Sequence, residues 1–88
     1  MTEVTFSPEA VEDYKYWKKC NPAVVKRIKL LLLDMCRHPH TGIGKPERLK
    51  YELSGWWSRR IDVEHRIVYA VRESGIYILS LRYLYDKK

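Results

Sequence analysis

Cysteine is scarce in this chain of 88 residues, and the little that is present forms no cluster. Cys20 and Cys36 are the only cysteines, and neither belongs to a C-x-x-C motif, which argues against a disulfide framework or a redox pair. His38 and His40 follow Cys36, but no second group of ligands accompanies them, so we expect no metal site and no cofactor. Both thiols are expected to be reduced, in a cytoplasmic protein.

Long apolar runs are also absent. The longest, Leu30 to Leu33, is far shorter than the roughly 20 residues of a membrane-spanning helix. The first residues lack the apolar core of a signal peptide, so neither export nor a membrane partner is expected. No repeat, linker or low-complexity segment divides the sequence, and residues 1–88 are therefore predicted to form a single domain.

Acidic residues are outnumbered: 11 Asp and Glu stand against 17 Lys and Arg, giving a formal net charge of +6. In so small a domain this excess favours a polyanionic partner, either nucleic acid or an acidic protein segment. Ordinary solubilising charge is the alternative explanation.

What is present predicts an α+β fold. Ser7-Pro8 and Asn21-Pro22 each combine a helix cap with a proline suited to the first helical turn, and apolar residues then recur with helical spacing. Pro39 ends the second helix. Beyond Pro46 the apolar period changes from 3.6 to 2, which predicts three or four antiparallel strands with both helices on one face. The predicted strands are 3–6 at the N-terminus, then 47–53, 57–62, 66–71 and 76–83.

The loop between the two arginine-bearing strands decides which arginines share a face. With a two-residue turn at 63–64, Ile61 pairs with Arg66, and Arg59 points the same way as Arg66. A loop one residue longer or shorter puts Arg60 in that place instead. Either register places two guanidinium groups close together on the face without helices, where their repulsion favours an anionic ligand.

The stretch from Gly42 to Arg66 sets one carboxylate, Glu47, among several cations. Arginine holds phosphate through two donors in a fixed geometry, and a carboxylate beside it can take a proton from a ribose 2′-hydroxyl. The pattern therefore indicates metal-independent cleavage of a phosphodiester, with the cations as phosphate clamps. The alternative is a plain surface ion pair between Glu47 and a neighbouring lysine. The cations are Lys45, Lys50, Arg59, Arg60 and Arg66.

Three aromatic or titratable side chains in the same region have a structural and a functional interpretation. His65 alternates onto the face of Ile67, away from Arg66, which favours a structural role over acid–base chemistry. Trp56 and Trp57 must point to opposite faces. One is predicted to belong to the core, and the other either packs at the rim or stacks on a base.

Ordered motifs then carry a resemblance to a known family. G-I-G-K-P-E-R-L-K, L-S-G-W-W-S-R-R-I and E-H-R-I-V-Y, followed by a terminal R-Y-x-Y, resemble the YoeB/Txe branch of the RelE-like toxins of type II toxin–antitoxin systems. The early D-Y-x-Y-W at Asp13 to Trp17 is also similar, and the likeness spans essentially the whole chain.

The resemblance implies a microbial RNase-like fold and a ribosome-dependent endoribonuclease, or mRNA interferase. Such a toxin cleaves mRNA in the ribosomal A site by attack of the 2′-hydroxyl on the adjacent phosphate, without metal. The implied partners are a cognate YefM/Axe-type antitoxin, the ribosome and its mRNA, operator DNA through the antitoxin complex, and a second copy of the chain in a homodimer.

The resemblance also implies roles for individual residues. Glu47 falls at the family's general base and Arg66 at its transition-state-stabilising arginine. Lys50 and Arg60 match positions that hold RNA, and Tyr85 matches the terminal tyrosine.

One position departs from the family pattern. Where the family ends R-Y-H-Y, with a histidine as general acid, this chain has Leu84. Leucine cannot donate a proton, and Tyr83, Tyr85 or Lys50 are the substitutes within reach of the motif. A phenol of Tyr83 or Tyr85 can also contact a phosphate. An attenuated or non-catalytic module that acts through antitoxin and operator binding is the alternative. Gyrase-poisoning relatives need no carboxylate among cations, so Glu47 argues against that class.

Overall fold

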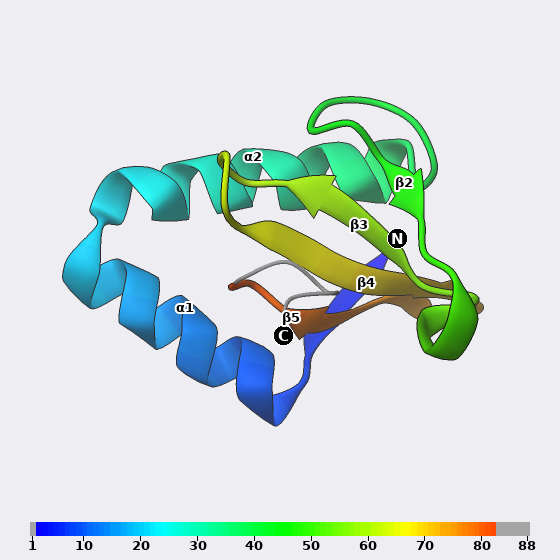
Figure 1. Cartoon of the computed structure of the whole chain (residues 1–88), viewed down its shortest axis with the longest axis horizontal. Helices are drawn as coiled ribbons and strands as arrows, with labels where there is room; N and C mark the ends of the chain where they lie inside the picture. Colours follow the sequence, from blue (N-terminus) through cyan, green and yellow to red (C-terminus); the bar gives the residue numbers. More distant parts are fainter. Residues whose placement is uncertain (1, 83–88) are drawn as a thin grey trace.

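The computed structural model describes residues 2–82, so the predictions for Tyr83, Leu84 and Tyr85 fall outside the described residues. The chain forms an N-terminal strand, two consecutive helices and then an antiparallel run of strands, which confirms the predicted α+β class (Figure 1). The elements are β1 (Glu3–Phe6), α1 (Pro8–Cys20), α2 (Pro22–Arg37), β2 (Glu47–Arg48), the short 3₁₀ helix η1 (Tyr51–Leu53), β3 (Trp57–Arg60), β4 (Arg66–Arg72) and β5 (Gly75–Ser80).

Both helices start at the predicted prolines, but only Ser7 caps through its side chain, since that of Asn21 makes no capping hydrogen bond. The Ser7 hydroxyl accepts a hydrogen bond from the Ala10 amide at 3.0 Å, and Pro8 occupies the first turn of α1. The backbone amide of Asn21 donates to the carbonyl of Trp17 and ends α1, after which Pro22 begins α2. The break between the helices is therefore a single residue, and the two helices pack against each other as a hairpin.

The sheet has five strands in the order β1-β5-β4-β3-β2. Strands β2 to β5 are antiparallel neighbours, but β1 pairs with β5 in parallel, so the sheet is mixed. The antiparallel meander was predicted, whereas the parallel partner of the N-terminal strand was not specified.

Three of the predicted strands end early. The strand expected over 57–62 ends at Arg60. The strand expected over 47–53 ends at Arg48, because the chain turns into η1 and Tyr51 adopts a left-handed backbone with φ of 59°. The strand expected to reach position 83 ends at Ser80. The next amide, that of Leu81, donates instead to the buried Asp13 carboxylate at 2.9 Å.

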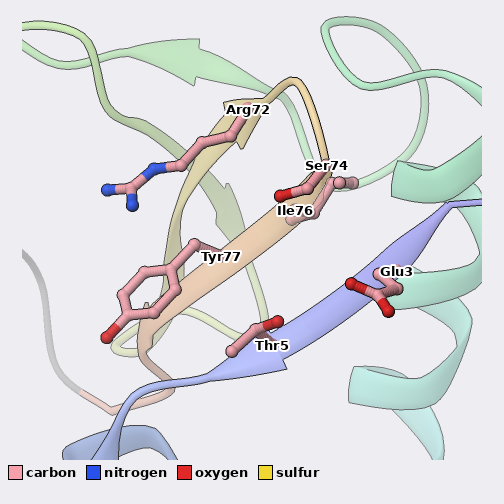
Figure 2. Close-up of a pocket in the computed structure, with 7 residues that line it drawn as sticks. Glu3, Thr5, Arg72, Ser74, Ile76 and Tyr77 are labelled. Atoms are coloured by element: carbon pink, nitrogen blue, oxygen red, sulfur yellow. The ribbon is translucent and has the colours of Figure 1, made fainter.

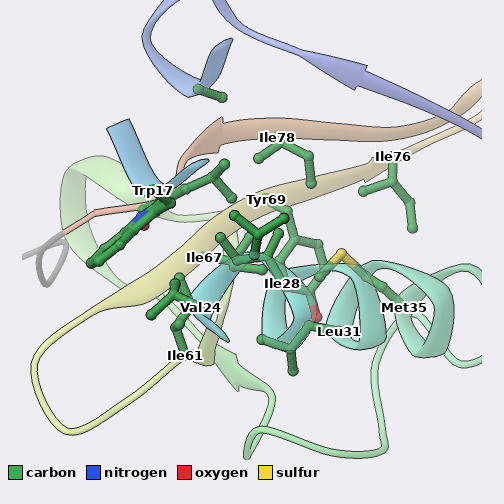
Figure 3. Packing of buried hydrophobic residues seen from close by; sticks show 13 residues of the cluster. Trp17, Val24, Ile28, Leu31, Met35, Ile61, Ile67, Tyr69, Ile76 and Ile78 are labelled. Atoms are coloured by element: carbon green, nitrogen blue, oxygen red, sulfur yellow. The ribbon is translucent and has the colours of Figure 1, made fainter. Parts of the chain in front are cut away.

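One hydrophobic core lies between both helices and a single face of the sheet (Figure 3). Ile28, Leu31 and Met35 of α2 are fully buried against Tyr69 of β4 and Ile78 of β5. Because side chains alternate along a strand, the residues between these core positions point to the other face. That second face carries Glu47, Ser58 and Arg66, as the strand register requires. No helix within residues 2–82 is long and apolar enough to cross a membrane.

Candidate active site

Glu47 and Arg66 form an ion pair on the face of the sheet opposite the helices. The distance from Glu47 Oε1 to Arg66 Nη2 is 2.9 Å, although the residues lie on strands separated by β3. Ser58 of β3 stands between them, since it pairs with Glu47 on one side and with Val68, two residues beyond Arg66, on the other. The structure thus brings together the predicted base and the predicted phosphate clamp.

Arg66 is held in place from two further directions. Its Nε donates to the Ser58 hydroxyl at 2.8 Å, and its Nη2 lies 3.4 Å from the carbonyl oxygen of Lys45. The Arg66 side chain is 8% exposed, whereas that of Glu47 is 62% exposed. A guanidinium fixed by a hydroxyl, a carbonyl and a carboxylate is preorganised, and the open side of the pair is the side of Glu47.

Arg60 lies directly opposite Arg66 in the β3–β4 pairing and is exposed. The two-residue turn is therefore wrong, and the alternative register holds. The loop runs from Ile61 to His65, and the amides of Ile61 and Asp62 both donate to the His65 carbonyl. The Asp62 carboxylate accepts from the His65 amide at 2.7 Å, which stabilises the longer loop.

Arg59 consequently faces the helices, and its predicted position on the phosphate-binding face is wrong. Its side chain is 0% exposed, and its Nη1 forms an ion pair of 2.7 Å with Asp34 of α2. Nε donates to the hydroxyl of Tyr69 at 3.1 Å. The same guanidinium donates to three backbone carbonyls of the loop after α2, those of His38, Thr41 and Ile43.

We call this group of Asp34, Arg59 and Tyr69 the buried arginine hub. The hydrogen bond from Arg59 holds the pKa of the Asp34 carboxyl below its usual value. The hydrogen bond from the Ile43 amide lowers this pKa further, although desolvation by burial opposes the shift. Burial raises the pKa of the Tyr69 phenol, against the effect of Arg59. The Tyr69 hydroxyl also donates to the carbonyl of Pro39 at 2.8 Å. The hub therefore fixes the loop that leads to Lys45 and Glu47.

The two predicted lysines lie at either side of Glu47 and are exposed. Lys45 contributes its carbonyl to Arg66 and has a left-handed backbone with φ of 52°. Lys50 precedes η1, and within residues 2–82 no hydrogen bond or ion pair joins it to Glu47 or Arg66.

His65 and the tryptophans match the structural interpretations in part. The His65 ring packs edge-on against buried Trp17, with ring centroids 4.8 Å apart, which accounts for its placement away from Arg66. Trp57 packs against the core, and Trp56 contacts Tyr77 on the other face, 6.2 Å between centroids.

The sequence interpretation missed two residues of this region. Ser58 and Arg60 are two residues apart on β3 and so lie on the same face of the sheet. With the register known, this alternation would have placed Ser58 beside Arg66. Asp34 stands on the helix and gave no local signal of a partner 25 residues away. Among the described residues, no group of His, Cys, Asp or Glu could hold a metal ion.

Comparisons with known proteins identify the family. Residues 6–85 match the family model described as the YoeB-like toxin of bacterial type II toxin–antitoxin systems. Toxin YoeB of Escherichia coli K12 is 47% identical over 83 residues, which cover 94% of this chain and 99% of the relative.

Solved structures are similar over nearly the whole chain. The YoeB–YefM complex from Staphylococcus aureus contains a chain that is 49% identical, with a TM-score of 0.87 and coverage of 97% of this chain and 99% of that one. A YoeB dimer from the same organism is 48% identical, with a TM-score of 0.89 and coverage of 96% and 98%.

Proposed function

The chain belongs to the YoeB-like toxins of bacterial type II toxin–antitoxin systems, and we propose that it is a ribosome-dependent endoribonuclease that cuts mRNA in the A site. The observation that carries the proposal is the 2.9 Å pair of Glu47 and Arg66 on the open face of the sheet. A carboxylate that is largely exposed beside a fixed guanidinium suits proton abstraction next to an anionic phosphorus.

In the proposed reaction Glu47 takes the proton of the ribose 2′-hydroxyl. The 2′-oxygen then bonds to phosphorus, the bond from phosphorus to the 5′-oxygen breaks, and the leaving oxygen takes up a proton. Glu47 Oε1 contacts Arg66, which leaves Oε2 of the exposed carboxylate to act as base. Arg66, oriented by Ser58, stabilises the added negative charge on the phosphate oxygens.

The surrounding cations would hold the RNA backbone. Arg60 is exposed opposite Arg66, and Lys45 and Lys50 are exposed on either side of Glu47. Phosphate contacts of this kind position a nucleic acid without reading its sequence. Arg59 has no part in them, because its guanidinium is buried in the arginine hub.

Primer extension on mRNA translated in vitro tests the proposal. Glu47→Gln keeps the shape of the side chain but removes the base, and should lower cleavage by about 10²–10⁴-fold. Arg66→Ala should lower it by about 10²–10³-fold. Glu52→Gln, at another exposed glutamate, is the matched control and should cut like the unchanged protein. Equal cleavage by all three variants contradicts the assignment.

For the proton of the leaving group, the proposed donors are Tyr83, Tyr85 or Lys50. Leu84 stands where the family resemblance expects a histidine, and this observation favours attenuated cleavage or a non-catalytic role as the second candidate. Leu84→His should raise cleavage by up to about 10²–10⁴-fold if only the acid is missing, while Leu84→Gln should not. Tyr85→Phe and Tyr83→Phe test whether a phenol substitutes for the acid or contacts a phosphate.

The proposed partners follow from the relatives. A YefM-type antitoxin and a homodimer are proposed because the similar Staphylococcus aureus structures are a YoeB–YefM complex and a YoeB dimer. Operator binding through the antitoxin complex and a cytoplasmic location belong to the same proposal. Co-purification with the antitoxin, followed by operator gel shifts with and without it, tests these partners.

A further inference from the structure

A pocket of about 380 Å³ opens at the end of the sheet, where β2 stops and the chain turns through Ser54 and Gly55 into β3. Pockets that hold small molecules have volumes of about 300–1,000 Å³, so this one is large enough for a nucleobase. Its lining residues are His40, Arg48, Leu49, Ser54, Gly55, Trp56, Trp57 and Val71.

Flat aromatic and cationic groups dominate the side chains of this pocket. The rings of His40 and Trp57 have centroids 4.6 Å apart and are inclined by 38°, and the Arg48 guanidinium lies 5.9 Å from the Trp57 ring centroid. The ring of Trp56 also carries a guanidinium, that of Arg72, 5.5 Å from its centroid, although Arg72 itself does not line the pocket. Aromatic rings and guanidinium planes are the groups on which unpaired bases stack.

The charge of the pocket also suits a nucleotide. None of its lining residues is acidic, and Arg48 supplies a positive charge. A second hollow, about 80 Å³ between β1 and β5, is different (Figure 2). It is smaller, and the Glu3 carboxylate lines it together with Arg72, which disfavours an anion.

The position of the pocket links it to Glu47. β2 is an edge strand, and Arg48 pairs with Trp57 while Glu47 pairs with Ser58. Consecutive residues point to opposite faces, so Arg48 of the pocket and Glu47 of the ion pair project to the two sides of the same free edge. A single strand of RNA that crosses this edge would meet both.

We propose that the pocket of His40, Arg48, Trp56 and Trp57 binds one unpaired nucleobase of the RNA that flanks the phosphodiester held at Glu47 and Arg66. This inference rests on the proposed function, because it concerns the same RNA. An aromatic side chain of a protein partner is the competing occupant, but such a ligand brings no phosphate for the charge of Arg48 to contact.

The test is binding of short RNA by the full chain, measured by fluorescence anisotropy. The RNA carries a 2′-deoxy sugar at the cut position so that it cannot be cleaved, and each base is removed in turn to leave an abasic site. Loss of the stacked base should weaken binding at one flanking position by at least about fivefold. His40→Ala and Arg48→Gln should each weaken binding of the intact RNA, and should weaken binding of that abasic RNA much less.

Lys19→Gln removes one charge from the exposed end of α1 and is the matched control, which should show no dependence on the abasic position. Glu47→Gln should still bind RNA although it should cleave it far more slowly. A wrong catalytic assignment would therefore appear in the cleavage assay, and a wrong pocket assignment would appear in the binding assay. The inference is overturned if the unchanged protein binds no RNA, if every abasic site has the same effect, or if the pocket variants weaken only antitoxin binding. Circular dichroism of His40→Ala and Arg48→Gln checks that both exposed-site variants remain folded.

Discussion

Adjacent arginines on β3 should have opposite roles, and replacing each by methionine separates them. Arg59→Met removes a guanidinium that makes five hydrogen bonds while 0% exposed, and leaves Asp34 without its cation. Breaking a buried ion pair costs about 3–5 kcal/mol. Because the loop is exposed and water can reach the freed carbonyls, we expect the free energy of unfolding to fall by about 3 kcal/mol, at the low end of this range. At about 4–8 °C per kcal/mol, the melting temperature should fall by about 12–24 °C.

Arg60→Met is the matched control, since it removes the same charge one residue away from an exposed position. It should change the free energy of unfolding by less than about 0.5 kcal/mol, while weakening RNA cleavage through loss of a phosphate contact. Arg59→Lys keeps the charge without the planar fork and should fall between the unchanged protein and Arg59→Met. Urea unfolding followed by far-UV circular dichroism measures these differences. Equal loss of stability in Arg59→Met and Arg60→Met refutes the assignment of the hub.

Two further perturbations test the local structure. The pKa of Asp34 is lower in the folded chain than in the unfolded chain, so on acidification the carboxyl is protonated first in the unfolded chain. The contribution of Asp34 to the free energy of unfolding is therefore complete above about pH 4 and is lost as the pH falls towards the folded pKa. Asp34→Asn should therefore show a shallower loss of stability in acid, and an unchanged slope in acid-unfolding curves argues against the ion pair with Arg59. Gly75→Ala should cost about 2–3 kcal/mol, because φ is +145° and the added Cβ would lie 2.1 Å from the Glu3 carbonyl oxygen. Gly55→Ala, with φ of +95° and open space around the Cβ, should cost about 1 kcal/mol in the same urea assay, and equal costs would mean that β1 tolerates the methyl group.

Local sequence signals predicted most of the fold. Ser7-Pro8 and Asn21-Pro22 fixed the start of both helices, and the change of period after Pro46 predicted the meander. One error occurs where a distant contact decides the backbone. Strand β5 ends early because the Leu81 amide binds Asp13 of α1, a partner 68 residues away that no local pattern reveals.

The site was predictable in its residue types but not in its register. Alternation required that one of Arg59 and Arg60 share a face with Arg66, yet the choice depended on the length of the 61–65 loop. The Asp62 carboxylate stabilises that loop by accepting hydrogen bonds from two backbone amides. A side-chain turn of this kind makes the loop one residue longer than a two-residue turn. A shift of one residue moved Arg59 from the predicted RNA face into the core.

Lys45 provides a last prediction, in which stability and cleavage respond differently. Its φ of 52° is unfavourable for any side chain with a Cβ, and the carbonyl that this conformation directs at Arg66 is part of the site. Lys45→Gly and Lys45→Ala both remove the cation and should reduce cleavage equally. Only glycine relieves the backbone, so Lys45→Gly should be about 0.5–1 kcal/mol more stable than Lys45→Ala in urea unfolding. If alanine is tolerated as well as glycine, the left-handed backbone is not strained, and the turn before Glu47 is set by the contact with Arg66 alone.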